Sequence, residues 1–337
     1  MKILYLGSSA DWHVDTWVRY FTKDNQVFLF SDNVFYLKDQ PFDNVKVYKS
    51  YGILGSILNF FKIKSRFIFQ FNKIVSIQLF VSKIKKIVKE DEIDIIHAHS
   101  LYFGFLASFI NLKLPVVFTP MGSDVIRHAQ NNFFYKHMAE RAFQNCNITT
   151  SDSLLLQKKG FNVGAKKENN YIIQNGVDHN IFYPKSNNLK NKFKVKSDEI
   201  LLFSPRAITP LYNIDIILES ISMLKDKSYG IKCMFSYAFG DNYLSFLKEQ
   251  IIRLDINDNV IWLGYLDYEQ MAEHYNAADI IISIPSSDSS PKSVYEAMFC
   301  KKPVIVSDLE WTYEILDNLN SFCRVGVRDS LDLFESI

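Results

Sequence analysis

The sequence predicts an α/β protein with two parallel β-sheets. Short apolar or β-branched runs recur roughly every 20 to 30 residues, and amphipathic stretches of helical length separate them. This alternation is typical of βα units and therefore of parallel sheets. The chain has 337 residues, of which 48% are hydrophobic and 22% are charged. That composition excludes a disordered protein, and the length favours two domains, each with its own core.

Each apolar run is expected to form one strand. In the first half, strands are predicted at residues 2–7, 26–31, 45–49, 93–99, 115–119, 147–150 and 171–174. In the second half, they are predicted at residues 200–204, 231–237, 260–264, 279–284 and 303–307. Between the two series, residues 175–178 and 183–188 have turn chemistry and no hydrophobic periodicity. We therefore predict a first domain at 1–176 and a second domain at 177–337.

The ends of these strands are where functional residues are expected. Open parallel sheets bind their ligands at the carboxyl ends of the strands. Two such sheets in one chain predict a ligand cleft between the facing domains.

Cysteine spacing and hydropathy indicate a cytoplasmic protein. The four cysteines are scattered, without a C-x-x-C pair or a nearby histidine cluster. This pattern favours neither a disulfide framework nor a zinc site. The apolar run at residues 1–7 is too short for a signal peptide. The chain also has no stretch of about 18 apolar residues that would predict a membrane span.

Charge is distributed unequally between the two halves. Residues 1–170 contain 22 Lys or Arg and 14 Asp or Glu, whereas the remainder contains 16 and 23. The basic excess is concentrated in residues 51–89, which we call the basic stretch. It has eight basic residues, no acidic residue and several large apolar residues. Such a stretch is typical either of a solvated helix face or of a surface that binds an anionic membrane; nucleic acid is a less favoured partner because the chain has no recognised nucleic-acid module.

A strand, loop and helix at residues 280–298 contain the most informative group of polar residues. The apolar run is followed by a hydroxyl-rich loop, and Ser290 before Pro291 predicts an N-cap and first turn for the next helix. Backbone N–H groups at a helix start, with Lys292 beside them, are suited to bind phosphate. Asp288 lies in the loop and Glu296 in the second helical turn. The alternative is that Asp288 is a solvated loop residue and Glu296 only complements the helix dipole.

This segment resembles the donor-binding signature of the retaining glycosyltransferases of family 4, which have the GT-B fold of two Rossmann-like domains. Seven residues separate Asp288 from Glu296, as in the family's acidic pair, and Ala297 and Met298 follow. Other segments match in the family's order across nearly the whole chain: residues 94–99, 122–125, 175–178, 277–279 and 303–308.

Three positions depart from the family's pattern. Asp288 stands where the family usually has Glu, and Met121 stands before Gly122 where a His is common. After Arg206, the usual Lys-Gly pair is replaced by Tyr212 and Asn213. Lys292 is therefore expected to supply the missing positive charge.

The resemblance implies roles for individual residues. Asp288, Asp124 and Gly122 match the catalytic positions, and Ser8, His13, His99 and Ser123 match the acceptor side or the cleft. Donor and nucleotide binding is assigned to Arg206, Lys292, Glu296, Ser290 and Ser293. The donor implied is a nucleotide sugar, linked to UDP or GDP, with no cofactor and no metal ion.

Some of these residues also have a purely structural interpretation. His97 and His99 point to one face of a strand, where a core histidine is as common as a ligand contact. Asp124 follows a strand end and is either a helix cap or a ligand contact. His13 lies in the loop after the first strand, but Gly7 is not part of a G-x-G-x-x-G motif, so that loop is not a dinucleotide fingerprint.

The resemblance therefore implies a retaining glycosyltransferase of bacterial surface-polysaccharide synthesis, such as lipopolysaccharide or capsule. Its acceptor would be a glycan or a lipid-linked sugar, and the basic stretch would place it peripherally on the inner face of the cytoplasmic membrane. Met121 and Tyr212 motivate one alternative, a non-catalytic protein that binds nucleotide sugars. A sugar-nucleotide epimerase of the same fold is another.

Overall fold

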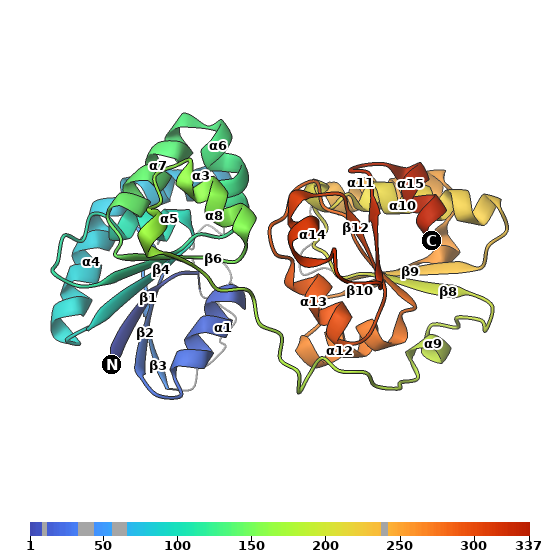
Figure 1. Ribbon diagram of the computed structural model, residues 1–337, viewed down its shortest axis with the longest axis horizontal. Coiled ribbons are helices and arrows are strands. Elements are labelled where there is room, and N and C mark those ends of the chain that lie inside the picture. Colours follow the sequence, from blue (N-terminus) through green and yellow to red (C-terminus); the bar gives the residue numbers. More distant parts are fainter. Residues whose placement is uncertain (9–11, 33–43, 56–65, 237–241) are drawn as a thin grey trace. The chain divides into compact units, whose positions relative to one another are not determined.

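The computed structural model describes residues 1–8, 12–32, 44–55, 66–236 and 242–337 of the chain (Figure 1). The chain divides into two compact units, which we call unit 1 (Met1–Gln174) and unit 2 (Asn175–Ile337). The boundary predicted after residue 176 lies two residues further along the chain.

Unit 1 contains a seven-stranded parallel sheet with the strand order β3-β2-β1-β4-β5-β6-β7. All seven predicted strands are present, with ends within two residues of the prediction. Their bounds are β1 (Lys2–Leu6), β2 (Gln26–Ser31), β3 (Val45–Lys49), β4 (Ile95–His99), β5 (Val116–Thr119), β6 (Ile148–Ser151) and β7 (Asn170–Ile172). The central strands are buried on both faces, which explains why they form continuous apolar runs in the sequence.

Helices cover both faces of this sheet (Figure 1). Ile3 and Tyr5 of β1 pack with Val14 and Val18 of α1 on one face. Leu4 and Leu6 belong to the larger core on the other face, which contains residues of α4, α5 and α7. The helices have these bounds: α1 (Trp12–Phe21), α3 (Arg66–Val75), α4 (Ile77–Glu90), α5 (Leu101–Ala107), η1 (Asp124–His128), α6 (Ala129–Asn131), α7 (Phe133–Gln144) and α8 (Leu154–Phe161).

Unit 2 contains a six-stranded parallel sheet with the order β10-β9-β8-β11-β12-β13. The bounds are β8 (Ile200–Ser204), β9 (Ile231–Ser236), β10 (Val260–Gly264), β11 (Ile280–Ser283), β12 (Val304–Ser307) and β13 (Phe322–Val325). The first five were predicted, and the edge strand β13 was not. The predicted α/β class with two parallel sheets is confirmed.

The helices of unit 2 also lie on both faces of their sheet (Figure 1). Helices α10, α11 and α15 contribute to the core on one face, and α12 and α13 lie on the opposite face. The bounds are α9 (Leu189–Lys192), α10 (Ile214–Asp226), α11 (Asn242–Arg253), α12 (Tyr268–Ala277), α13 (Lys292–Phe299), α14 (Glu310–Ile315) and α15 (Ser330–Ser336).

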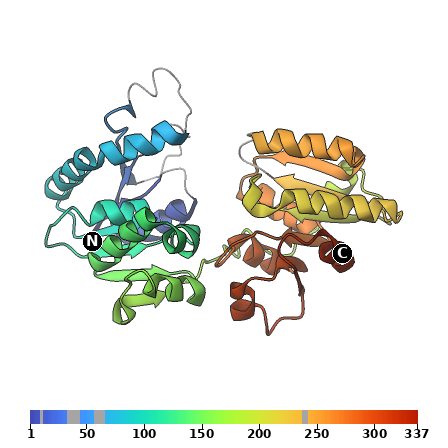
Figure 2. The ribbon, with the colours of Figure 1, turned by 90° about the horizontal axis from the view of Figure 1, so that it is seen from above.

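From residue 66 on, the basic stretch forms α3 and α4, which follow one another along one side of unit 1 (Figure 2). Part of its charge is neutralised by acidic residues from outside the stretch. Lys73 lies 2.6 Å from the buried carboxylate of Asp32, and Lys86 lies 3.6 Å from Glu90. The absence of acidic residues within the stretch therefore does not leave all of its cations without a carboxylate, because the fold and the next helical turn supply carboxylates.

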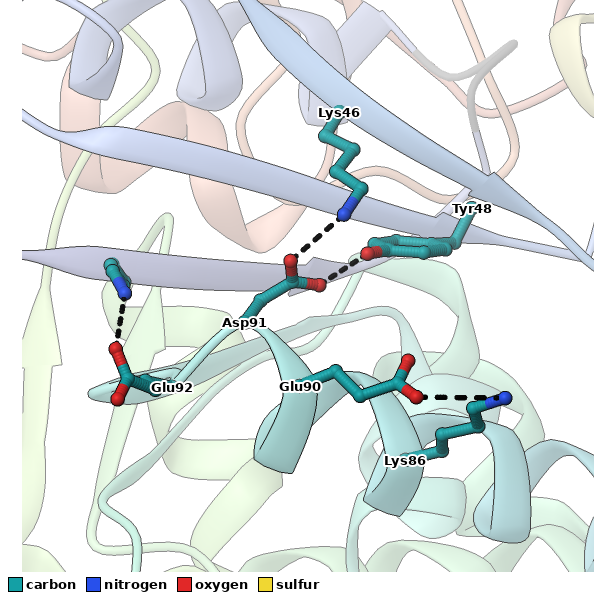
Figure 3. Close-up of polar contacts among 7 residues, drawn as sticks. Lys46, Tyr48, Lys86, Glu90, Asp91 and Glu92 are labelled. Carbon is teal, nitrogen blue, oxygen red and sulfur yellow. Dashed lines mark hydrogen bonds and ion pairs between the residues drawn. The ribbon is translucent and has the colours of Figure 1, made fainter.

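The C-terminal end of α4 is joined to β3 by a further group of charges (Figure 3). Asp91 accepts hydrogen bonds from Lys46 at 2.8 Å and from the hydroxyl of Tyr48. Lys2 pairs with Glu92 at 2.9 Å. These exposed pairs fix where α4 ends against the sheet, while contributing little individually to stability.

Of the helices among the described residues, none combines the length and the apolar composition needed to cross a membrane.

Candidate functional site

The main group of candidate residues lies at the carboxyl ends of two neighbouring strands of unit 2. Strands β8 and β11 pair in parallel, with Leu202 opposite Ile280. The loops that follow them therefore leave the same edge of the sheet side by side. The first loop carries Arg206, and the second carries Asp288 and leads into α13.

Arg206 connects the two loops. Its Nη2 lies 2.7 Å from Oδ2 of Asp288, and its Nη1 donates to Oγ of Ser293 at 2.8 Å. The guanidinium group also lies 4.3 Å from the ring centroid of Tyr212, in cation–π contact. Tyr212 thus occupies the place expected for a second cation and packs against the first one instead.

The Arg206–Asp288 pair is largely buried, with side chains that are 11% and 17% exposed. Burial alone lowers the pKa of Arg206, but Asp288 and Tyr212 together outweigh it, and the pKa is raised overall. Arg206 is therefore a fixed cation whose present partner is a carboxylate. A ligand phosphate would have to share Arg206 with Asp288 or displace the carboxylate of Asp288 from it.

Glu296 lies one helical turn further, in a second buried group. Its Oε2 lies 3.0 Å from the hydroxyl of Tyr275, and its Oε1 lies 3.7 Å from Nζ of Lys292. Burial raises the pKa of Glu296 to about 7, although Lys292, Tyr275 and Arg206 all act in the opposite direction. A carboxyl group with this pKa near neutral pH, beside two cations, is typical of a ligand-binding or catalytic site.

The start of α13 differs from the prediction. The helix begins at Lys292, Pro291 occupies the N-cap position, and no side chain caps the helix. The hydroxyl of Ser290 instead lies 2.8 Å from the hydroxyl of Tyr295. The predicted Ser290 cap was wrong because this contact turns the serine side chain toward the first helical turn.

In unit 1, Asp124 ties together two strand-end loops. Its Oδ2 accepts from the N–H of Leu101, the first residue of α5, at 2.6 Å. Its Oδ1 accepts from the N–H of Met121 at 3.1 Å. Burial raises the pKa of Asp124 to about 7, against the effect of these hydrogen bonds. Asp124 therefore binds the start of α5 and does not cap η1, the helix that it begins. Its predicted contact with a ligand stays a prediction.

The neighbours of Asp124 form a compact turn. Gly122 has φ +36°, a conformation that side-chain-bearing residues rarely adopt. Ser123 is exposed, and Ser8, which follows β1, is partly buried. The side chain of His13 lies outside the described residues.

His97 and His99 belong to an aromatic cluster in the core of unit 1. Their rings lie 4.3 Å apart, and the ring of Tyr5 lies 4.9 Å from His97. Trp17 of α1 contacts both histidines edge-on. Nε2 of His97 lies 2.8 Å from the hydroxyl of Thr119, and burial lowers the pKa of His97 to about 3. His97 is thus a neutral core residue, and His99 is equally buried.

Sequence reasoning missed several residues of the unit 2 site. Tyr275 and Tyr268 come from α12, where Tyr268 lies 4.9 Å below the charge of Lys292. Asn213 ends the loop after β8, and Arg328, from the loop after β13, donates a hydrogen bond to it. No signal in the sequence distinguishes these tyrosines from ordinary core aromatics. Asn213 directly follows Tyr212 in the departure from the family pattern and could have been found there.

Two family profiles match the chain. The profile described as "Glycosyl transferase 4-like" matches residues 2–153 in unit 1. The profile described as "Glycosyl transferases group 1" matches residues 185–325 in unit 2. Most of the candidate residues therefore lie within a segment that one of the two profiles matches.

Individual proteins are also similar to this chain. The α-monoglucosyldiacylglycerol synthase of Streptococcus pneumoniae is 26% identical over 241 residues, which are 66% of this chain and 54% of the synthase. The mannosylfructose-phosphate synthase of Agrobacterium fabrum is 24% identical over 155 residues, which are 43% of this chain and 34% of that protein. The chain thus spans about half the length of the first of these relatives and a third of the second.

Solved structures share the fold. Anabaena HepE in complex with UDP-glucose has a TM-score of 0.78 at 20% identity, covering 100% of this chain and 88% of that one. Sucrose-phosphate synthase from Thermosynechococcus elongatus has a TM-score of 0.83 at 13% identity, covering 99% and 88%. Because the two profiles together cover both units and the fold agrees, this chain belongs to the group 1 and 4-like glycosyltransferases, with the GT-B fold.

Proposed function

We propose that this protein is a metal-independent, retaining glycosyltransferase that moves a hexosyl group from a UDP- or GDP-sugar to a glycan or lipid-linked acceptor. In this proposal unit 2 binds the donor and unit 1 the acceptor. The protein acts at the inner face of the cytoplasmic membrane, in the synthesis of a bacterial surface polysaccharide such as lipopolysaccharide or capsule.

One observation carries the proposal. Arg206, Lys292 and Glu296 converge at the carboxyl edge of the unit 2 sheet, within two buried hydrogen-bonded groups. The cations suit a diphosphate, and the carboxylate suits the hydroxyls of a ribose or sugar. The UDP-glucose complex of HepE, which has the same fold, supports a nucleotide sugar as the donor.

The chemistry requires little from the protein beyond charge and position. The bond between the sugar's anomeric carbon and the diphosphate oxygen breaks, and the acceptor oxygen bonds to that carbon from the same face. The leaving phosphate oxygen takes the acceptor's proton, so no separate general base is needed. Arg206 and Lys292 stabilise the negative charge that accumulates on the diphosphate, and in this proposal Asp288 contacts the donor sugar.

The test is a panel of nucleotide sugars with product analysis. Melting curves identify the donor, since a ligand at 100 times its dissociation constant adds about 2.7 kcal/mol. Transfer from that donor to a lipid-linked acceptor, with the anomeric configuration kept, is expected by NMR. Binding without transfer would favour the non-catalytic alternative, and interconversion of the free sugar nucleotide would favour an epimerase.

Chelation is expected to leave turnover unchanged. In this proposal the diphosphate charge is balanced by Arg206 and Lys292, so a divalent cation is not needed for that purpose. The measurement compares initial rates before and after dialysis against EDTA. A loss of activity that manganese or magnesium restores would contradict metal independence.

Membrane association is expected to depend on the basic stretch. Exposed apolar side chains on α3, such as Phe71 and Ile74, precede the lysines of α4 in the chain. Each basic residue near an anionic leaflet contributes about 1 kcal/mol. Changing Lys83, Lys85 and Lys86 to Glu is therefore expected to release the protein from vesicles of anionic phospholipid, with the wild-type binding weakening as salt rises.

A matched control places the same three charge reversals in unit 2. The surface lysines chosen for it are Lys192, Lys227 and Lys248. Vesicle sedimentation should distinguish the two triple variants, while both keep the wild-type affinity for UDP. Equal sedimentation of wild type and both variants would mean that the basic stretch is an ordinary solvated surface.

The name of the pneumococcal relative, a monoglucosyldiacylglycerol synthase, supports a lipid acceptor.

A further inference from the structure

Two residues in left-handed backbone conformations are joined by a side-chain hydrogen bond beside the proposed donor site of unit 2. Asn213 has φ +52° and Arg328 has φ +61°. Nη1 of Arg328 donates to Oδ1 of Asn213 at 2.9 Å, across 115 residues of sequence. Asparagine tolerates this conformation, whereas for arginine it is costly. Arg328 therefore makes this hydrogen bond from an unfavourable backbone conformation.

Asn213 is a fully buried junction between the two loops that carry Arg206 and Asp288. Its Nδ2 donates to the carbonyl of Ile284 at 2.8 Å, and its Oδ1 accepts from Oγ of Ser286 at 3.0 Å. The N–H of Ser286 in turn donates to the carbonyl of Leu211 at 2.8 Å. The loop after β8 and the loop after β11 are thereby held in one register, one residue from Tyr212 and two residues from Asp288.

Arg328 brings a third loop, the one after β13, to this junction. Its Nη2 lies 2.6 Å from Oδ2 of Asp215, whose Oδ1 accepts from the hydroxyl of Tyr243 at 3.0 Å. Asp215 thus holds one end of the guanidinium group, and the other end points at Asn213. A planar fork held at one end delivers its other end in a fixed direction.

We propose that Arg328 is a positioning residue of the donor site, which acts through Asn213 on the loops of Arg206 and Asp288. The inference rests on the proposed function, because it takes those loops to bind the nucleotide sugar. Arg328 itself does not touch the reacting atoms. It keeps Asn213 oriented so that Ser286 and the backbone of Ile284 hold the Asp288 loop against the Arg206 loop.

A role confined to fold stability explains the same residue less well. The side chain of Arg328 is 48% exposed, and ion pairs at such exposure contribute little to stability. The loop after β13 also has its own fastenings. Asp329 caps α15 by accepting from Leu331 and Asp332, and Asp332 accepts from the N–H of Gly326 at 2.6 Å. Arg328 is therefore not needed to fold the loop in which it lies.

Arg328→Gly separates positioning from stability, since glycine adopts φ +61° freely. The variant loses both hydrogen bonds of the fork and at the same time relieves the backbone strain. We expect a melting temperature close to that of the wild type. We also expect a loss of about tenfold in UDP affinity and in kcat/KM for the donor sugar, the scale seen when outer residues that orient a site are removed.

Asn213→Gly and the double variant test the route. If Arg328 acts through Asn213, the double variant binds UDP no more weakly than Asn213→Gly alone. Lys225→Gln is the matched control, because it removes an exposed ion pair with Asp255 at the C-terminal end of α10. It is expected to keep wild-type UDP affinity.

The outcomes separate this inference from the function on which it rests. Wild-type protein that binds neither UDP nor GDP in the calorimeter would contradict the proposed function. Wild-type binding with unchanged affinity and kcat/KM in Arg328→Gly would overturn the positioning role alone. If Arg328→Gly does not fold, Arg328→Lys decides. Lysine keeps a charge beside Asp215 without the fork, so undiminished UDP affinity in that variant would likewise overturn the proposal.

Discussion

Replacing Arg206 with alanine is expected to weaken UDP binding by about 1.5 to 3 kcal/mol, the usual contribution of a hydrogen bond to a charged group. This corresponds to a roughly 10- to 150-fold increase in the dissociation constant. Arg206 is the buried cation between the loops that follow β8 and β11, and its guanidinium group is held in place by Asp288, Ser293 and the ring of Tyr212. Isothermal calorimetry with UDP measures the change directly.

Two further variants show whether the loss comes from the guanidinium group or from disturbed packing. Arg206→Lys keeps the charge but cannot replace the fork, so we expect an intermediate affinity. Asp288→Asn removes the carboxylate that pairs with Arg206. UDP affinity is therefore expected to stay or increase in that variant while sugar transfer falls. Unchanged UDP affinity in Arg206→Ala would remove Arg206 from the donor site.

The strands could be predicted from sequence because buried parallel strands have a strong local signal. Runs such as 200–204 are apolar on both faces and leave no doubt about their type. Strand β13 (Phe322–Val325) was missed because it has only four residues and Arg324 interrupts their apolar pattern.

The candidate site could be predicted only where its residues lie close together in the sequence. Asp288, Lys292 and Glu296 belong to one strand, loop and helix, so their spacing carries information. Tyr275 reaches Glu296 from another helix, and Arg328 reaches Asn213 across 115 residues. Such contacts are created by the strand order of the sheet, which the sequence does not display. The ion pair of Lys73 with Asp32 is a further contact of this kind.

Glu296 is expected to make the stability of unit 2 fall as pH rises. Burial raises its pKa from 4.5 to about 7 in the folded protein. Between these values the folded state holds a proton that the unfolded state has lost, so the free energy of unfolding decreases with pH. The stabilisation is complete below pH 4.5 and is lost as pH rises through 7, a difference of about 3 kcal/mol.

Urea denaturation of the wild type and of Glu296→Gln at pH 5 and pH 8 isolates this effect. Glutamine resembles the protonated carboxyl group and does not titrate. From pH 5 to pH 8, the free energy of unfolding of the wild type should therefore fall relative to that of the variant by most of this difference. Other groups, such as Asp124 with its own raised pKa, contribute equally to both proteins and cancel. A constant difference between the two proteins across this range would mean that Glu296 titrates normally.

Donor binding should respond to the same proton in the opposite direction. Ribose hydroxyls donate hydrogen bonds, and an ionised carboxylate accepts them more strongly than a protonated one. UDP affinity of the wild type is therefore expected to increase as pH rises through 7, more steeply than that of Glu296→Gln. Comparing the two proteins cancels the effect of the titration of the UDP phosphate, because that effect is the same for both. If the two affinities change in parallel with pH, Glu296 has a structural role beside Tyr275 and does not bind the ribose.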